Sequence, residues 1–159
     1  MTEKIVIFGA TGDLCKRKLI PALYELHNQE LLSETFEIIG ASRTNHGRES
    51  WLQHLGEYPE DFTHRLDYIC CDLSNPETLK KLESPDDDVT YFLSVPPERY
   101  GDAIVNLKTT GLLDDAERSR VVIEKPFGTD LRSADSLQRV VAEHLREKQV
   151  YRIDHYLGK

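Results

Sequence analysis

Cysteine is scarce in this sequence, and its three cysteines have no spacing that suits a zinc site or a disulfide framework. Cys15, Cys70 and Cys71 are an odd number without a CxxC pair, which favours reduced thiols in a cytoplasmic protein. We interpret the adjacent Cys70 and Cys71 as strand residues, with a redox-active pair as the alternative. We therefore predict a cytoplasmic protein without a metal site.

Long apolar runs and an excess of positive charge are missing as well. No run approaches the length of a transmembrane helix, and the opening residues MTEKIVIFG lead into a strand without the apolar core of a signal peptide. The formal net charge of -8 argues against a nucleic-acid partner, because phosphate backbones demand a basic surface. We expect neither a membrane nor a nucleic acid as partner. A small anion stays compatible with a local cationic cluster such as residues 16–18.

What the chain does contain suits one globular domain. Its 159 residues, 39% hydrophobic and 30% charged, can bury one core but are too few for two domains of ordinary size. We find no internal repeat, low-complexity tract or linker. Residues 1–159 are therefore assigned to a single domain.

Short β-branched and aromatic runs alternate with helical patterns along the chain. The predicted strands lie at 4–9, 36–41, 65–71, 89–95, 120–125 and 149–154. Helices are expected at 13–28, around 48–55, around 76–83, at 97–109, and from a cap at Thr129 or Asp130 to residue 145. Pro21 should kink or split the first helix. The alternation predicts an α/β, Rossmann-like, doubly wound and mainly parallel six-stranded sheet with helices on both faces.

The stretch IVIFGATGDLCKRKL joins a buried strand to a helix through two glycines, as at the entry of a dinucleotide-binding fold. Gly9 suits the tight turn, and Gly12 lets the start of the helix approach a pyrophosphate. The alternative is that both glycines serve only the turn. We interpret Asp13 as the helix cap, and the small Cys15 as a close packing contact between helix and strand.

The end of the second strand, GASRT, carries Arg43 where an NAD-binding site usually has an acid for the ribose hydroxyl. A guanidinium can form charge-assisted, bidentate bonds to a 2′-phosphate, so NADP is the predicted cofactor. A solvated surface arginine is the alternative.

The later strand ends SVPP, EKPFG and DHYLGK should open onto the same crevice, because ligands gather at the carboxyl ends of parallel strands. Pro96 and Pro97 either lie beside the nicotinamide or begin the next helix. Lys125 is expected to face the crevice, with an exposed lysine as the alternative.

The last segment, RIDHYLGK, is rich in anion-binding and acid-base groups. His155, Tyr156 and Lys159 suit a phosphate dianion. Asp154 is a candidate partner for a histidine base, because a carboxylate fixes the imidazole tautomer and stabilises the imidazolium. Any one of these side chains taken alone could be an exposed terminal group.

Together, GATGDLCKRKL, ASRT, EKPFG and above all RIDHYLGK resemble the glucose-6-phosphate 1-dehydrogenase family. The resemblance runs from Ile5 to Lys159 and covers that family's coenzyme domain, although residues 45–88 carry no motif that aligns. It implies oxidation of C1 of glucose 6-phosphate to the lactone, with hydride transfer to NADP, in the oxidative pentose phosphate pathway.

The resemblance also implies roles for individual residues. The cofactor contacts are Gly9, Thr11, Gly12, Asp13, Leu14 and Lys16 in the glycine loop, Arg43 at the 2′-phosphate, Val95 and Pro96 beside the cofactor, and Lys125 between cofactor and substrate. His155, Tyr156 and Lys159 resemble the substrate-phosphate site, and Asp154 resembles the carboxylate that orients the catalytic histidine.

In that family the catalytic histidine lies beyond the signature, in a larger β+α domain that also forms the dimer. None of His27, His46, His54, His64 and His144 stands in the family's general-base motif. A missing base should lower the rate by at least ~10²- to 10⁴-fold, so we expect this chain to bind cofactor far better than it turns over sugar. The missing half would come from a complementary catalytic chain or a homo-oligomer.

Three other functions remain open at this point. The chain could be a non-catalytic NADP-binding or assembly module, or a two-domain sugar or inositol dehydrogenase, which shares the EKP strand end but gives no reason for DHYLGK. A short-chain reductase would also suit GATG, yet its Tyr-x-x-x-Lys spacing disagrees with Tyr156 and Lys159.

Overall fold

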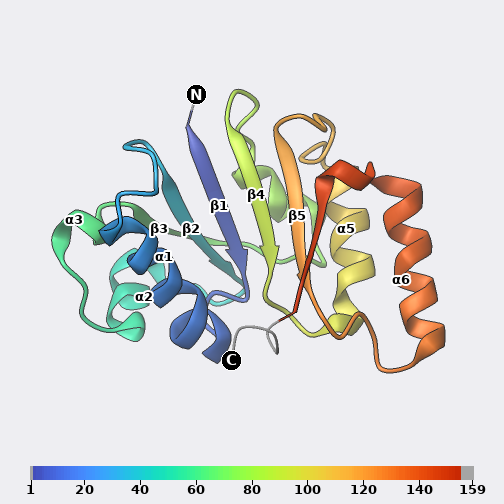
Figure 1. Ribbon diagram of the computed structural model, residues 1–159, viewed down its shortest axis with the longest axis horizontal. Helices are drawn as coiled ribbons and strands as arrows, with labels where there is room; N and C mark the ends of the chain where they lie inside the picture. Colours follow the sequence, from blue (N-terminus) through green and yellow to red (C-terminus); the bar gives the residue numbers. More distant parts are fainter. Residues whose placement is uncertain (1, 155–159) are drawn as a thin grey trace.

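The computed structural model describes residues 2–154 and shows a six-stranded sheet in which every paired strand is parallel (Figure 1). In sequence order the strands are β1 Glu3–Phe8, β2 Glu37–Ser42, β3 Leu66–Cys70, β4 Asp88–Leu93, β5 Ser119–Glu124 and β6 Val150–Ile153. Their spatial order is β3-β2-β1-β4-β5-β6. The order reverses between β1 and β4, and such a switch point opens a ligand crevice at the carboxyl ends of the strands.

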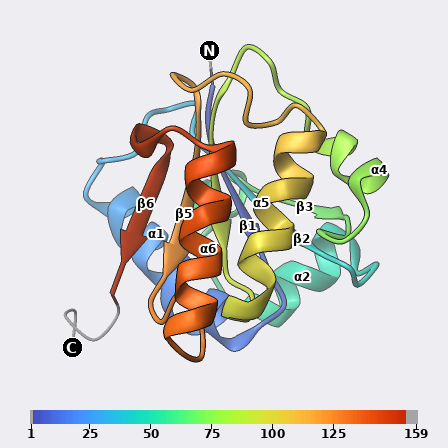
Figure 2. The same ribbon diagram turned by 90° about the vertical axis from the view of Figure 1, so that its right-hand side faces the viewer.

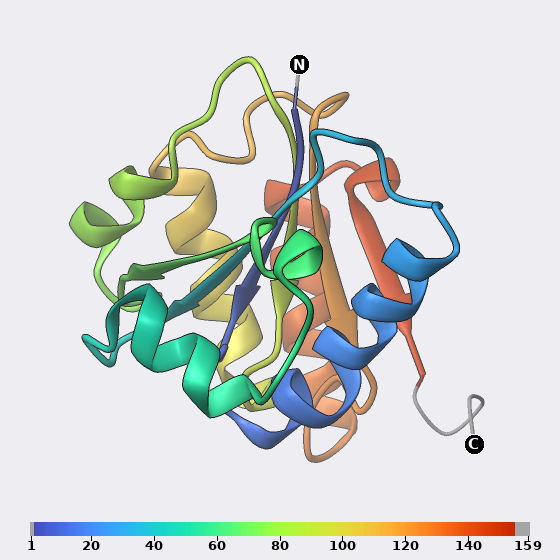
Figure 3. The same cartoon turned by 90° about the vertical axis from the view of Figure 1, so that its left-hand side faces the viewer.

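Helices cover both faces of the sheet, as the doubly wound prediction requires. One face carries η1 Cys15–Leu19, α1 Ile20–Asn28, α2 Gly47–Leu55 and α3 Glu60–Thr63, which lie in front of the sheet in Figure 3. The other face carries α4 Pro76–Leu79, η2 Lys80–Leu82, η3 Pro97–Arg99, α5 Tyr100–Thr109 and α6 Leu131–His144, and Figure 2 shows α5 and α6 side by side over it. The predicted fold class is confirmed.

A close contact between β2 and α2 fixes one side of the sheet. Trp51 is fully buried, and its ring occupies the space where Gly40 has no side chain: a Cβ at Gly40 would lie 2.5 Å from Trp51 Cζ2. Trp51 Nε1 donates a hydrogen bond of 2.9 Å to the carbonyl of Ala10, in the loop after β1. The indole therefore holds the glycine loop by a hydrogen bond and also fills the core between β2 and α2.

The first helix differs from its prediction at Pro21. Helical residues run without a break from 13 to 28, so Pro21 does not split the helix. Instead residues Cys15–Leu19 form a π turn, in which the N–H of Ile20 bonds the carbonyl of Cys15 five residues back. A proline lacks the N–H and crowds the carbonyl four residues before it, and the wider π turn relieves both problems locally.

The last helix begins as predicted. Asp130 is its cap, and its side chain accepts a hydrogen bond of 2.8 Å from the N–H of Ser133 in a capping box. The apolar face that packs on the core contains Leu137 and Val141, with Leu145 just beyond the helix end. Two short elements had no prediction, α3 and η4 Glu147–Gln149.

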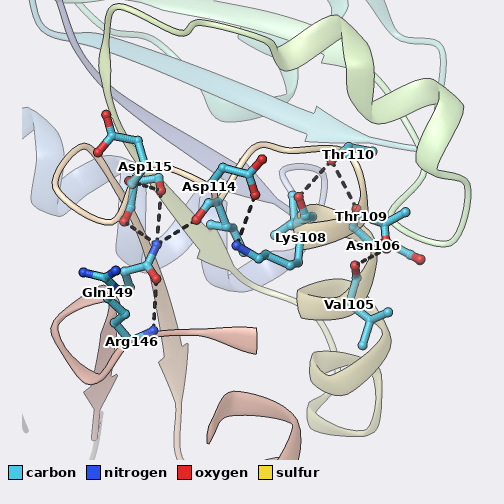
Figure 4. A network of polar contacts seen from close by, with 12 residues as sticks. Val105, Asn106, Lys108, Thr109, Thr110, Asp114, Asp115, Arg146 and Gln149 are labelled. Atoms are coloured by element: carbon cyan, nitrogen blue, oxygen red, sulfur yellow. Dashed lines mark hydrogen bonds and ion pairs between the residues drawn. The ribbon is translucent and has the colours of Figure 1, made fainter. Parts of the chain in front are cut away.

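Gln149, expected as the first residue of the last strand, instead ends η4 and fixes the start of β6. It is 2% exposed, and its Nε2 donates to the carbonyls of Leu113 (3.0 Å) and Ser119 (3.2 Å). Figure 4 shows the side chain of Gln149 beside Arg146. Oε1 of Gln149 accepts from the N–H of Arg146 at 3.0 Å. These bonds determine where β6 begins, and hence where residue 154 lies.

Candidate functional site

A crevice of about 250 Å³ lies at the carboxyl ends of the central strands, at the switch point between β1 and β4. Its walls come from the loops after β1, β2, β3 and β4 and from the start of α5: Phe8, Gly9, Thr11, Gly12, Ala41, Ser42, Arg43, Thr44, Cys71, Leu73, Ser94, Val95, Pro96 and Arg99. Six predicted cofactor contacts meet here, namely Gly9, Thr11, Gly12, Arg43, Val95 and Pro96.

A larger hollow of about 310 Å³ lies at the opposite, amino end of β4 and β5. Its wall includes Asp87, Asp114 and Asp115, whose carboxylates oppose an anionic ligand. Ligands of open α/β sheets bind at the carboxyl ends of the strands. We therefore take the smaller crevice as the functional site.

The turn after β1 depends on Gly9. Its φ is +81°, and a Cβ there would lie 1.9 Å from the carbonyl oxygen of Ser94 in the neighbouring loop. The N–H of Gly9 bonds the carbonyl of Ala41 at 3.0 Å, and the N–H of Gly12 bonds the carbonyl of Gly9 at 3.0 Å. Only glycine fits this position, and the compact turn leaves the start of the helix open toward the crevice.

Asp13 is not the helix cap, so that interpretation is wrong. It is the first residue of the helix and not the residue before it. Its exposed carboxylate lies 4.0 Å from the guanidinium of Arg17, one turn later. It does not line the crevice, and neither do Leu14 and Lys16. Cys15 is fully buried as expected, and burial raises its pKa to about 12.

Backbone contacts on both sides of Arg43 hold its turn. Tyr68 on β3 donates its hydroxyl proton to the carbonyl of Thr44, so Ser42 Oγ must be the donor in its own bond to Tyr68 Oη. Ser42 Oγ in turn accepts from the N–H of Thr44 at 3.2 Å, and Cys70 Sγ donates to the carbonyl of Arg43 at 3.4 Å. The backbone is fixed, while the exposed Arg43 side chain lies in the crevice wall.

Sequence reasoning missed Tyr68 and Arg99. Tyr68 lies in a segment with an ordinary strand pattern. Only the pairing of β2 with β3 brings its hydroxyl to the carbonyl of Thr44. Burial raises the pKa of Tyr68, which keeps its proton available to that carbonyl. Arg99, at the end of η3, lines the same crevice as Arg43, which follows β2. No local motif marks Arg99 as a ligand contact.

The two cysteines that end β3 have different surroundings. Cys70 is the last residue of β3, whereas Cys71 follows it and is 3% exposed. Burial, with a smaller contribution from Cys70, raises the pKa of Cys71 to about 11. The interpretation as strand residues is confirmed for Cys70 and wrong for Cys71, which lies just beyond the strand; a redox-active pair stays the untested alternative.

Pro96 and Pro97, the two prolines after β4, have different positions. Pro97 begins η3, as the helix-start alternative requires. Pro96 precedes it in extended conformation and lines the crevice with Val95. The N–H of Ser94 bonds the carbonyl of Phe8 at 3.0 Å, which joins this loop to the glycine turn.

Lys125 and Asp154 lie together at a neighbouring part of the same sheet edge. Lys125 follows β5, and its N–H bonds the carbonyl of Ile153, the last residue of β6, at 2.9 Å. The exposed Lys125 does not line the crevice, so the structure separates it from the other predicted cofactor contacts. Asp154 is half-buried directly after β6. The predicted substrate contacts His155, Tyr156 and Lys159 lie outside the described residues.

Within residues 2–154, no helix has the length and apolar character to cross a membrane. The same range has no group of three or more histidine, cysteine, aspartate or glutamate side chains placed to hold a metal ion.

Comparison with known proteins gives a consistent family. The family model described as "Glucose-6-phosphate dehydrogenase, NAD binding domain" matches residues 6–159. The glucose-6-phosphate 1-dehydrogenase of Bacillus subtilis (strain 168) is 37% identical over 174 residues, an alignment that covers 98% of this chain and 35% of that protein. The chain thus spans about a third of the length of this curated relative.

Solved structures agree. A glucose-6-phosphate dehydrogenase in complex with its substrate glucose 6-phosphate superposes with a TM-score of 0.84 at 33% identity, covering 99% of this chain and 37% of that one. The glucose-6-phosphate 1-dehydrogenase of Mycobacterium avium gives a TM-score of 0.86 at 33% identity, covering 98% and 36%.

Proposed function

The chain belongs to the glucose-6-phosphate dehydrogenase family as its nucleotide-binding domain, and from this premise we propose that its crevice binds NADP in preference to NAD. One observation carries the proposal: Arg43 lies in the crevice wall from a turn held by Tyr68. The residues beside it, Ser42 and Thr44, leave no carboxylate at the end of β2 to bind a ribose 2′-hydroxyl.

The crevice fits a dinucleotide on a second ground. Gly9 and Gly12 keep side chains out of the turn at the start of the first helix, where free backbone N–H groups attract a pyrophosphate. Thr11 would contact the pyrophosphate, Gly12, whose N–H already bonds Gly9, would let it approach closely, Arg43 would bind the 2′-phosphate, and Val95 and Pro96 would contact the nicotinamide half. A nicotinamide cofactor in this crevice supplies the two-electron acceptor for oxidation of an alcohol.

We assign the whole protein the oxidation of glucose 6-phosphate at C1, in the cytoplasm. Lys125 and Asp154 form the substrate side of the site, where the Lys125 ammonium attracts an anionic sugar and Asp154 orients a histidine base. His155, Tyr156 and Lys159 are proposed to bind the sugar phosphate. The base itself comes from a complementary catalytic region, on the same or another chain or in a homo-oligomer.

Calorimetric titration of this chain with NADP and with NAD tests the cofactor assignment. Selective binding of NADP is expected, because only NADP has a 2′-phosphate that Arg43 could bind. Equal affinity for the two cofactors would contradict the assignment.

The same sample then receives glucose 6-phosphate while the absorbance of the reduced cofactor is followed. We expect no turnover without the base, and turnover by this chain alone would refute the need for a complementary region. Mixing with the catalytic part of a relative should restore activity. Failure of that mixture to turn over would favour a non-catalytic NADP-binding module; family membership already favours this function over an inositol dehydrogenase.

A further inference from the structure

We propose that Arg99 forms, together with Arg43, a two-guanidinium site for the 2′-phosphate of NADP. The inference rests on the proposed function and adds a second specificity-determining residue to it. Arg99 belongs to η3 at the entry of α5, 56 positions after Arg43 in the chain, so the two side chains reach the crevice from separate elements.

The fold brings these two positions to one crevice from opposite sides of β1. Arg43 follows β2, which pairs with one edge of β1, and Arg99 follows β4, which pairs with the other edge. Both residues line the crevice of about 250 Å³, to which Cys71 and Leu73 from the end of β3 also contribute. A ligand group in this crevice can therefore meet cationic residues from two separate elements.

The local turn holds the backbone of Arg99. Pro96 is extended, Pro97 starts the 3₁₀ turn, and the N–H of Arg99 bonds the carbonyl of Pro96 at 2.9 Å. Arg99 is half-buried, and its neighbour Glu98 lines a different hollow, between α5 and α6. The helix entry thus turns a cation toward the crevice and an acid away from it.

The pKa of Asp72 indicates which half of the crevice lies near the charges of Arg43 and Arg99. Asp72 follows β3, and its pKa is lowered chiefly by hydrogen bonds from Ser74 Oγ and the Ser74 N–H, and further by the charges of Arg43 and Arg99. Both guanidinium groups therefore influence the end of β3, on the adenosine side of the switch point, rather than only the β4–β5 side that would receive nicotinamide.

Asp72 is the acidic group that the charges of both arginines influence, and within residues 2–154 neither guanidinium is bonded to it. Within residues 2–154, no hydrogen bond or ion pair is found for the side chain of Arg43 or Arg99, whereas Arg120 pairs with Asp88 at 2.9 Å and Arg152 with Glu147 at 2.6 Å. A phosphate monoester carries a charge of about -1.5 to -2 at pH 7 and offers three acceptor oxygens, enough for two forked donors. NAD offers only a hydroxyl at the same position, so the pair discriminates between the cofactors.

The test compares four forms of the full chain: wild type, Arg43→Ala, Arg99→Ala and the double variant. Calorimetry measures their affinities for NADP and NAD, and for adenosine 2′,5′-bisphosphate and 5′-AMP, a pair that differs only in the 2′-phosphate. We expect Arg99→Ala to weaken NADP and the bisphosphate by about 10- to 100-fold and to change NAD and 5′-AMP by less than about 3-fold. The double variant should lose less than the product of the two single losses.

Lys81→Ala is the matched control for a general loss of positive charge. Lys81 lies beside the same strand end, donates to the carbonyl of Cys70 at 2.9 Å, and does not line the crevice. It should change NADP affinity by less than about 3-fold. Arg99→Lys and Arg99→Gln, compared by urea unfolding, keep the test valid if the alanine variant is unstable; lysine should retain part of the selectivity and glutamine none.

Four outcomes would overturn the inference. Equal losses for NADP and NAD in Arg99→Ala would place the side chain at the pyrophosphate or the base, and unchanged NADP affinity would remove it from the site. A wild type without preference for NADP would overturn the proposed function and this inference together. A wild type that prefers NADP and loses the preference only in Arg43→Ala would leave the proposed function standing and reject the role of Arg99.

Discussion

The nucleotide half of the sheet edge, over β1 to β3, differs from the substrate half, over β5 and β6, in the kind of contacts described for it. Around Arg43, two hydroxyls, a thiol and three backbone groups fix one turn, and Trp51 fixes the loop beside it. Around Lys125, the contacts include the bond from its N–H to Ile153 and the bonds that Tyr100 Oη makes with the backbone of Glu124. The nucleotide half is held by contacts within this domain, whereas the chemistry proposed at C1 would need groups from outside it.

The largest effect should come from Gly9→Ala, which breaks the nucleotide half directly. The new Cβ would have to displace the Ser94 carbonyl, 1.9 Å away, from a backbone with φ of +81°. We expect a loss of about 3 kcal/mol or more in the free energy of unfolding, together with loss of NADP binding. Urea unfolding and calorimetry measure the two effects.

Gly47→Ala is the control for Gly9→Ala. Gly47 has a similar φ of +72° but no atom within 4 Å of its Cβ position. It should therefore show only the backbone strain, about 1 kcal/mol, with NADP affinity unchanged. Equal destabilisation by the two variants would contradict the role given to the Ser94 contact.

Arg43→Ala should come next, because it removes the phosphate contact while it leaves the held turn in place. The affinity for NADP should fall by about 1.5–3 kcal/mol, the value of a hydrogen bond to a charged group, and the affinity for NAD by much less. Titration with each cofactor at one fixed salt concentration measures the difference, because phosphate contacts are screened by salt. Parallel losses for both cofactors would reject the 2′-phosphate assignment.

Trp51→Phe tests whether the core supports the nucleotide half. It removes the bond to Ala10 and part of a fully buried ring, so we expect destabilisation by about 2 kcal/mol and weaker NADP binding. Tyr91→Phe on β4 is the comparison, since Tyr91 is 2% exposed and its hydroxyl has no hydrogen bond within residues 2–154. That change should alter stability by less than about 0.5 kcal/mol; a similar loss in both variants would mean that the indole bond has no special role.

The smallest effect concerns pH. The pKa of Cys15 rises from 9.0 to about 12 in the folded chain, because burial disfavours the thiolate. The stabilising effect of the neutral thiol is complete below pH 9, and it is lost progressively above pH 9, as the unfolded thiol ionises, up to pH 12. Relative to Cys15→Ala, the wild type should lose about 1 kcal/mol of stability between pH 8 and pH 10. Parallel stability curves for the two proteins, measured by urea unfolding, would contradict the burial of this thiol.

Local pattern predicted the sheet and much of its crevice. The six strands, the turn at Gly9 and the Asp130 cap all depend on a few consecutive residues, and the structure confirms each of them. Arg43 lies in the crevice wall, and its contact with a 2′-phosphate stays a prediction. The errors arise where the conformation of a residue depends on the adjoining segment. Asp13 was expected before the helix, but the helix already includes it, because the tight turn ends at Gly12.

Other residues acquire their roles only through tertiary contacts. Tyr68 needs the register of β3 against β2, Gln149 needs the loop before β5, and Arg99 needs the start of α5 to meet the end of β3. The residue spacing within one helix or strand does not encode these tertiary contacts. The roles of Tyr68, Gln149 and Arg99 could therefore be recognised only in the folded chain.

The contact among Gly40, Trp51 and Ala10 also limits how this domain can change over generations. A side chain at position 40 fits only if the indole at position 51 is replaced by a smaller group, and that replacement also removes the hydrogen bond to the carbonyl of Ala10 beside the crevice. Ala10 contributes only its backbone carbonyl, so this contact leaves its side chain free to vary. Positions 40 and 51 should therefore be inherited as a pair, and a library that randomises both at once should recover combinations that single-site libraries miss.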